Sequence, residues 1–185
     1  VVLPEYLVDD YPAVGRMLHD CGADVAFTGH FHSQDIAPDS TVTDVETGSL
    51  VSYPHPYRVI EVSGDKMSVT THNLRSIKSL AAQGEDLWQM SQKFARLSVA
   101  KMAEGYLPQN TPPAMRDTIV KVVSDAYLYH LAGDERPSED FVKENRRLAE
   151  QVSAVAPKMA SMLDIIVTSL STDQAPSDNQ AVINY

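Results

Sequence analysis

The sequence predicts an α/β fold that continues into a helical region, and three observations lead to this class. Short runs of β-branched and aromatic residues, separated by glycine, proline and acidic residues, fill the first part of the chain, 1–75. Apolar residues at spacings of three and four recur within 76–172 and predict about three helices. The remainder, 173–185, is polar and has no period, so a loosely held tail is expected there.

The first predicted elements are a helix and a short buried strand. Asp10 as N-cap, Pro12 in the first turn and Gly22 after the last turn are typical of the ends of a helix over 11–21. The apolar run 24–28 predicts a strand that ends at a glycine. Because a helix leads directly into this strand, we expect an α/β layer in which the C-terminal end of the strand opens into a loop.

Three further strands are expected in the first part of the chain. After a loop rich in Pro, Asp and Ser, one strand lies around 43–46, and two more lie over 57–62 and 67–72. The residues between the last two, 63–66, include a glycine and predict a hairpin turn. The strand 57–62 alternates without a clean polar side, so both of its faces are expected to be covered.

The helical region divides at its proline and glycine residues. The first helix is expected over 85–106 and is broken by the proline-rich stretch 107–113, the second ends at Gly133, and the third has Ser138 as N-cap. Pro157 should kink or interrupt this third helix. A heptad seam, which fits either an intramolecular bundle or a dimeric coiled coil, is formed by Leu148, Val152, Val155, Met159, Met162 and Ile166.

Charge and composition narrow the classes of partner. The 185 residues carry a formal net charge of −10, and residues 1–75 hold eleven acidic side chains against four basic ones. A protein that binds duplex nucleic acid presents a basic face, so neither duplex nucleic acid nor an anionic membrane surface is expected as a partner. No apolar run is long enough to cross a membrane. The negative net charge does not exclude a phosphorylated substrate, because bound cations can reverse the local sign of the charge.

The chain start and the cysteine content leave the compartment open. Cys21 is the single cysteine, which excludes an intramolecular disulfide and fits either a cytoplasmic protein or a periplasmic or secreted one. The sequence opens on Val1 with no initiator methionine, so we expect a piece of a longer protein whose targeting segment would lie upstream.

His30 and His32 are the sharpest candidates for chemistry. They flank Phe31 directly after a predicted strand and Gly29. In an extended chain, residues two apart point to the same side, so the two imidazoles can meet one metal ion or two neighbouring ions. Gly29 permits a turn and a close approach of the backbone to the site. The alternative is that the two histidines only form hydrogen bonds within a loop.

The segments DVAFTGHFHSQD and DVETGSLVSYPHPYRVIEV together resemble the C-terminal catalytic stretch of the calcineurin-like metallophosphoesterases. The resemblance covers residues 1–75 and implies the last part of a two-sheet α/β sandwich with metals at the strand ends. It implies that His30 binds the second metal ion and His32 the first, with iron, manganese or zinc as the two ions. The implied reaction is two-metal hydrolysis of a phosphate mono- or diester, in a small-molecule, nucleotide or protein substrate.

The remaining metal-binding motifs of that family, Asp-x-His, Gly-Asp, Gly-Asn-His-Asp/Glu and an upstream histidine, do not occur in these 185 residues. Two imidazoles without a bridging carboxylate hold a pair of metal ions poorly. We therefore expect this chain alone to bind one metal ion or none and to have little or no phosphoesterase activity.

Weaker candidates accompany the histidine pair. Asp35 would orient a histidine ring or lie solvated in a loop, and Arg58 would contact phosphate or pair with Glu46 or Glu61. His55, between two prolines, is expected to be structural. Trp88, Met90 and Phe94 are expected in a helix core.

A different class of function stays open beside the phosphoesterase. In this alternative the helices over 85–172 form a non-catalytic interaction or homo-oligomerisation module, and the histidine pair is vestigial.

Overall fold

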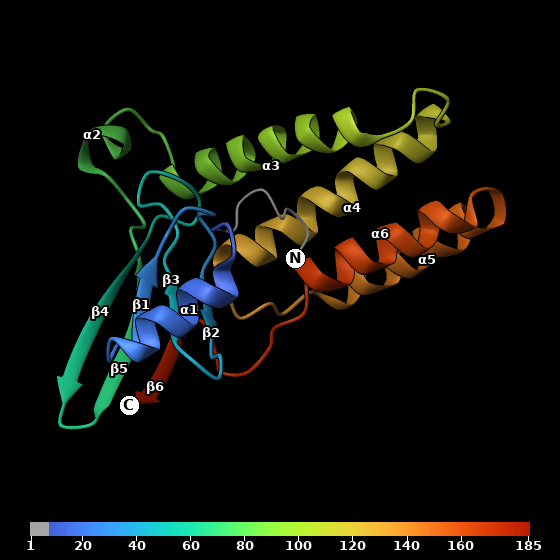
Figure 1. Ribbon diagram of the computed structural model, residues 1–185. Coiled ribbons are helices and arrows are strands. Elements are labelled where there is room, and N and C mark those ends of the chain that lie inside the picture. Colours follow the sequence, from blue (N-terminus) through green and yellow to red (C-terminus); the bar gives the residue numbers. More distant parts are fainter. Residues whose placement is uncertain (1–7) are drawn as a thin grey trace.

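Two small sheets and a group of long helices make up the residues that the structure, a computed structural model, describes, 8–185 (Figure 1). The chain forms α1 (Tyr11–Asp20), β1 (Val25–Thr28), β2 (Asp35–Ala37), β3 (Thr43–Glu46), β4 (Pro56–Ser63), β5 (Lys66–Asn73), α2 (Lys78–Ala81), α3 (Leu87–Tyr106), α4 (Pro113–Ala132), α5 (Glu139–Val155), α6 (Pro157–Leu170) and β6 (Gln180–Asn184). The mixed α/β class is therefore confirmed. Within 8–185, no helix combines the length and the apolar character that a membrane crossing needs.

The first sheet has the strand order β1-β3-β2. Strand β1 runs parallel to β3, with Thr28 opposite Glu46, and β2 runs antiparallel to β3, with Asp35 opposite the same Glu46. The ends of β1 and β3 and the start of β2 therefore meet at one edge. Strand β2 lies in a segment expected to be a loop, and Ile36, which is 1% exposed, holds it in the core.

The second sheet has the order β4-β5-β6, and its hairpin turn lies at the expected residues, 63–66. The expectation of a loose tail over 173–185 is wrong, because β6 pairs antiparallel with β5 along its length. Ala181 and Ile183 point into the core, while Val182 between them and the two end residues of the strand are exposed. This period of two extends over only five residues, too few to stand out in a polar tail.

Strand β4 has one open face, contrary to the expectation that both faces are covered. Tyr57 is 47% exposed and Val59 is 43% exposed, while Ile60 packs against the core. Strand β4 also lies at the edge of its sheet, next to β5. The inner faces of the two sheets share one apolar core, formed by Ile36, Val45, Met67, Val69, Ala181 and Ile183.

The helical region contains four long helices where about three were expected. Pro157 interrupts the third predicted helix, so α5 ends at Val155 and α6 begins at the proline. Helix α4 packs against α3, α5 and α6 (Figure 1). The heptad seam does not continue across the break: Leu148 and Val152 are buried, but Val155 is 67% exposed. The chain reverses direction after α5, and α6 packs back along it (Figure 1).

Helices α1 and α3 begin and end close to the predicted residues but pack less than expected. None of the residues of α1 is buried, and Asp10 makes no side-chain hydrogen bond at its N-terminus. In α3, Asp86 accepts a hydrogen bond from the backbone N–H of Gln89. Phe94 is 72% exposed, so its assignment to a helix core is wrong.

Candidate functional site

The loop between β1 and β2 carries both candidate metal ligands, and both His30 and His32 are exposed. His32 has a φ of 64°, in the left-handed region, so the extended geometry expected for a His-x-His pair does not hold. Gly29 passes close to the next loop: a Cβ there would lie 3.0 Å from the carbonyl oxygen of Thr47. The loops after the parallel strands β1 and β3 are thus in contact at one edge of the sheet.

Two buried polar side chains that follow the histidines hold their loop in place. Ser33 and Gln34 are each 1% exposed. The Ser33 hydroxyl donates to Glu46 Oε2 at 3.2 Å, and Gln34 Nε2 donates to the hydroxyl of Thr71 at 3.0 Å. Gln34 Oε1 accepts a hydrogen bond of 2.6 Å from the backbone N–H of Gly48. These bonds tie the loop after β1 to both sheets, so the backbone under the histidines is held in place.

Glu46 places a carboxylate next to this loop, in contact with Ser33. Burial raises its pKa, while the Ser33 hydrogen bond lowers it and repulsion from Asp44 raises it further. The backbone N–H of Phe31 also donates to the Glu46 carboxylate. The other oxygen of this carboxylate, Glu46 Oε1, is buried and has no hydrogen-bond partner among residues 8–185. The position of Glu46 next to the histidine loop depends on the register of β1 with β3, which the sequence alone does not give.

Arg58 joins the two sheets at the same edge. Its Nη2 donates to the carbonyl oxygens of Glu46, at 2.6 Å, and Asp35, at 3.3 Å. Burial lowers the pKa of Arg58, and attraction from Asp178, Asp35 and Glu46 opposes that effect. The guanidinium therefore contacts backbone oxygens, whereas the sequence had suggested carboxylates or a phosphate. The role expected for Asp35, to orient a histidine ring, stays a prediction.

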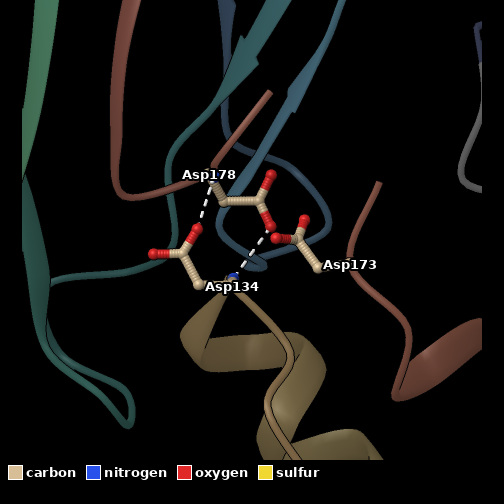
Figure 2. A group of neighbouring side chains, drawn as sticks. All are labelled: Asp134, Asp173 and Asp178. Carbon is tan, nitrogen blue, oxygen red and sulfur yellow. Dashed lines mark hydrogen bonds between the residues drawn. The ribbon is translucent and has the colours of Figure 1, made fainter. Parts of the chain in front are cut away.

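A second group of acidic residues lies where the end of α4 meets the last strand (Figure 2). One carboxylate oxygen from each of Asp134, Asp173 and Asp178 lies within 4.8 Å of the others. Asp134 Oδ1 accepts from the backbone N–H of Asp178 at 2.7 Å, and Asp178 Oδ2 accepts from the backbone N–H of Asp134 at 3.0 Å. Asp178 Oδ1 also accepts from the N–H of Ile36 at 3.0 Å, which ties the group to β2.

No sequence motif marks this aspartate group, because Asp134 lies about forty positions from the other two members in the chain. Burial raises the pKa of Asp178 to about 7, against two backbone hydrogen bonds that lower it. Burial also raises the pKa of Asp134, but hydrogen bonds from Ser177 and Asn179 outweigh this effect, so the pKa of Asp134 is lowered. Three carboxylates suit a hard cation, but the hydrogen bonds already show a structural function, the joining of α4, β2 and the tail.

The two histidines fit a metal site only in part. Imidazole nitrogens suit zinc, manganese or iron, and both side chains are accessible. Within residues 8–185, the aspartates are the one group of three or more potential ligands found within metal-binding distance, so no third ligand completes the site at His30 and His32. Comparison with protein-family models finds no family that matches this chain, and comparison with curated proteins finds no match either.

Proposed function

We propose that this chain is the C-terminal portion of a metal-dependent phosphoesterase of the calcineurin-like type, which hydrolyses phosphate mono- or diesters. The observation that supports it best is the position of His30 and His32 in the loop that follows the C-terminal end of β1, which pairs parallel with β3. In α/β proteins, ligands bind at this end of parallel strands. The buried bonds of Ser33 and Gln34 support the proposal further, because a metal site needs a fixed backbone.

In this proposal the chain supplies two imidazole ligands, and polypeptide outside the 185 residues supplies the others. When bound, the two metal ions would activate water and stabilise the charge on the phosphoryl oxygens. Ser33 and Gln34 hold the loop, and Glu46 places negative charge beneath it, which favours cations. The shared core of the two sheets is compatible with the end of a two-sheet sandwich.

Metal binding and hydrolysis by the 185-residue chain test the proposal directly. We expect calorimetry with Zn²⁺ or Mn²⁺ to detect at most one weakly bound ion, lost in both His30→Ala and His32→Ala. His19→Ala, on the exposed surface of α1, is the matched control and should leave binding unchanged. The chain alone should not hydrolyse bis(p-nitrophenyl) phosphate. If the chain alone shows strong metal-dependent hydrolysis and His32→Ala abolishes it, the proposal that its metal centre is incomplete is refuted.

The longer polypeptide that supplies the other ligands gives the second half of the test. There, either histidine substitution should lower kcat for the same diester by about 100-fold or more, because even residues that only support metal ligands have effects near that size. Unchanged kcat in both variants would show that the histidines take no part in the reaction.

The alternative, a helical interaction module with a vestigial histidine pair, has one observation in its favour. Phe94, Leu97 and Tyr106 on α3 are 72%, 61% and 71% exposed, an apolar surface that a second copy could cover. If Leu97→Glu converts an oligomer to a monomer in light scattering, this alternative gains support. A wild-type chain that stays monomeric at high concentration counts against it.

A further inference from the structure

A cavity of about 460 Å³ opens beside the histidine loop. Its volume falls within the range of small-molecule sites in proteins. The loops that follow β1 and β3 form one wall, and α3 and α4 form the other. The residues that line it include His32, Tyr53, His55, Phe94, Tyr127 and Leu131.

The walls of this cavity are mainly apolar and aromatic. Tyr53 is 8% exposed and packs edge-on against Trp88, with ring centroids 5.0 Å apart, so this wall is supported from behind. Leu131 is also buried, whereas Phe94 lies at the exposed side on α3. Phe94 and Met90, expected in a helix core, are 72% and 43% exposed and line the cavity. Such a surface favours an aromatic or aliphatic group over a charged group.

His55 adds one buried polar group to the wall. It is 4% exposed and has a φ of 59°, and its Nδ1 lies 3.0 Å from the carbonyl oxygen of Leu50. Because a carbonyl only accepts, Nδ1 is the donor of this contact, and in the neutral ring Nε2 is the acceptor nitrogen. Nε2 is buried and has no hydrogen-bond partner within the described residues. Because Nε2 has almost no accessible surface, it does not face the open cavity, and His55 contributes the packing of its ring to the wall.

We infer that this cavity binds the aromatic or apolar alcohol part of a phosphate ester whose phosphate lies at His30 and His32. The inference rests on the proposed phosphoesterase function. The observation behind it is that the cavity adjoins the histidine loop: His32 belongs both to that loop and to the cavity wall. The helical region then determines which ester is accepted, since α3 and α4 supply much of the wall.

The first experiment measures binding without metal or catalysis. Calorimetry of the metal-free chain with 1-naphthol should detect binding that Ser98→Trp weakens by about tenfold or more, because the new ring fills the cavity. Ser169→Trp, at an exposed site on α6, is the matched control and should bind like wild type. Phe94→Ala should weaken binding by about fivefold through lost apolar contact. No binding of 1-naphthol, or equal binding in wild type and Ser98→Trp, overturns the inference.

The second experiment separates the cavity from the proposed function. In the longer, metal-loaded polypeptide, Ser98→Trp should lower kcat/KM for 1-naphthyl phosphate by about tenfold and leave methyl phosphate unchanged. Equal effects on both esters would overturn the cavity inference while the phosphoesterase stands. If 1-naphthol binds as expected but His32→Ala leaves hydrolysis intact, the proposed function fails, and with it the placement of phosphate at the histidines.

Discussion

Asp178 makes the stability of the fold depend on pH. It is 4% exposed, and burial, with repulsion from Asp35 and Glu135, raises its pKa from 3.8 to about 7. The folded protein thus holds the proton more tightly than the unfolded chain, so protonation stabilises the fold. The contribution of Asp178 to stability is fully present below the unfolded value of 3.8 and is lost as pH rises through about 7. Burial also raises the pKa values of Asp44 and Glu46, which act in the same direction.

Urea unfolding between pH 4 and pH 8 measures this dependence. We expect the free energy of unfolding to fall as pH rises across this range, and the fall to be smaller in Asp178→Asn, because asparagine does not titrate. Asp65→Asn, in the exposed hairpin turn, is the control and should keep the wild-type slope. A wild-type stability that rises with pH over the same interval would contradict the assignment.

Arg58 should contribute to stability through its contacts with backbone. Its Nη2 donates to the carbonyls of Glu46 and Asp35, which a methionine side chain cannot replace. We expect Arg58→Met to lower the free energy of unfolding by about 2 kcal/mol, the size typical of hydrogen bonds from a charged donor. Arg75→Met is the comparison, since Arg75 is exposed and lies over the Trp88 ring at 3.6 Å; its loss should stay below about 1 kcal/mol. If Arg58→Met lowers the free energy of unfolding no more than Arg75→Met does, the backbone contacts of Arg58 add nothing beyond the effect of an exposed arginine.

At this scale the sequence could identify only residues that are near one another in the chain. His30, His32 and Gly29 form one short motif, so their shared loop was predictable. Asp134 and Asp178 meet because the chain folds back after α5 and α6 to form β6 in the second sheet, which no local pattern records.

Gly133 is the point where α4 ends and the aspartate group begins. Its φ is 66°, and a Cβ there would lie 2.9 Å from the Cβ atoms of both Asp178 and Gln34. We expect Gly133→Ala to lower the free energy of unfolding by roughly 2–4 kcal/mol, through backbone strain and a clash in a packed site. Gly105→Ala, in α3 with open space around it, should be neutral or stabilise by up to about 1 kcal/mol.

Thermal unfolding of the two glycine variants gives the comparison. A melting temperature for Gly133→Ala close to that of Gly105→Ala would mean that α4 and the tail are less tightly joined than the contacts indicate. The pair differs in position but not in the atom added, so helix propensity alone cannot explain a large difference.

Elements with a long period or a clear boundary signal were predictable, and short ones were not. Helix α3 and the hairpin of β4 and β5 lie near the expected residues because many side chains repeat the pattern. Strands β2 and β6 have three and five residues, and their strand conformation depends on pairing with β3 and β5. Pro157 marked a break but did not indicate whether the helix would kink or reverse.

At the scale of the whole molecule, the helical region is joined to the sheets at the candidate site. Tyr53, from the loop after β3, packs with Leu128 and Leu131 of α4 in one buried cluster. The hydrogen bond from Ile36 to Asp178 ties β2 to the tail. The proposed division at residues 75 and 76 stays a prediction, but β6 shows that the end of the chain completes the second sheet.

The open edge of β1 leads to a prediction about assembly. Within the described residues β1 pairs only with β3, and Phe27 is 56% exposed on it. Unpaired strand edges with apolar side chains tend to pair with another chain, so we expect the 185-residue protein to self-associate with rising concentration in light scattering. Phe27→Lys should shift the population toward monomer, because a charge on an edge strand opposes pairing. Tyr106→Lys, at the far end of α3, tests the helices: if it alone restores the monomer, association runs through the helical surface and the interaction-module alternative is favoured.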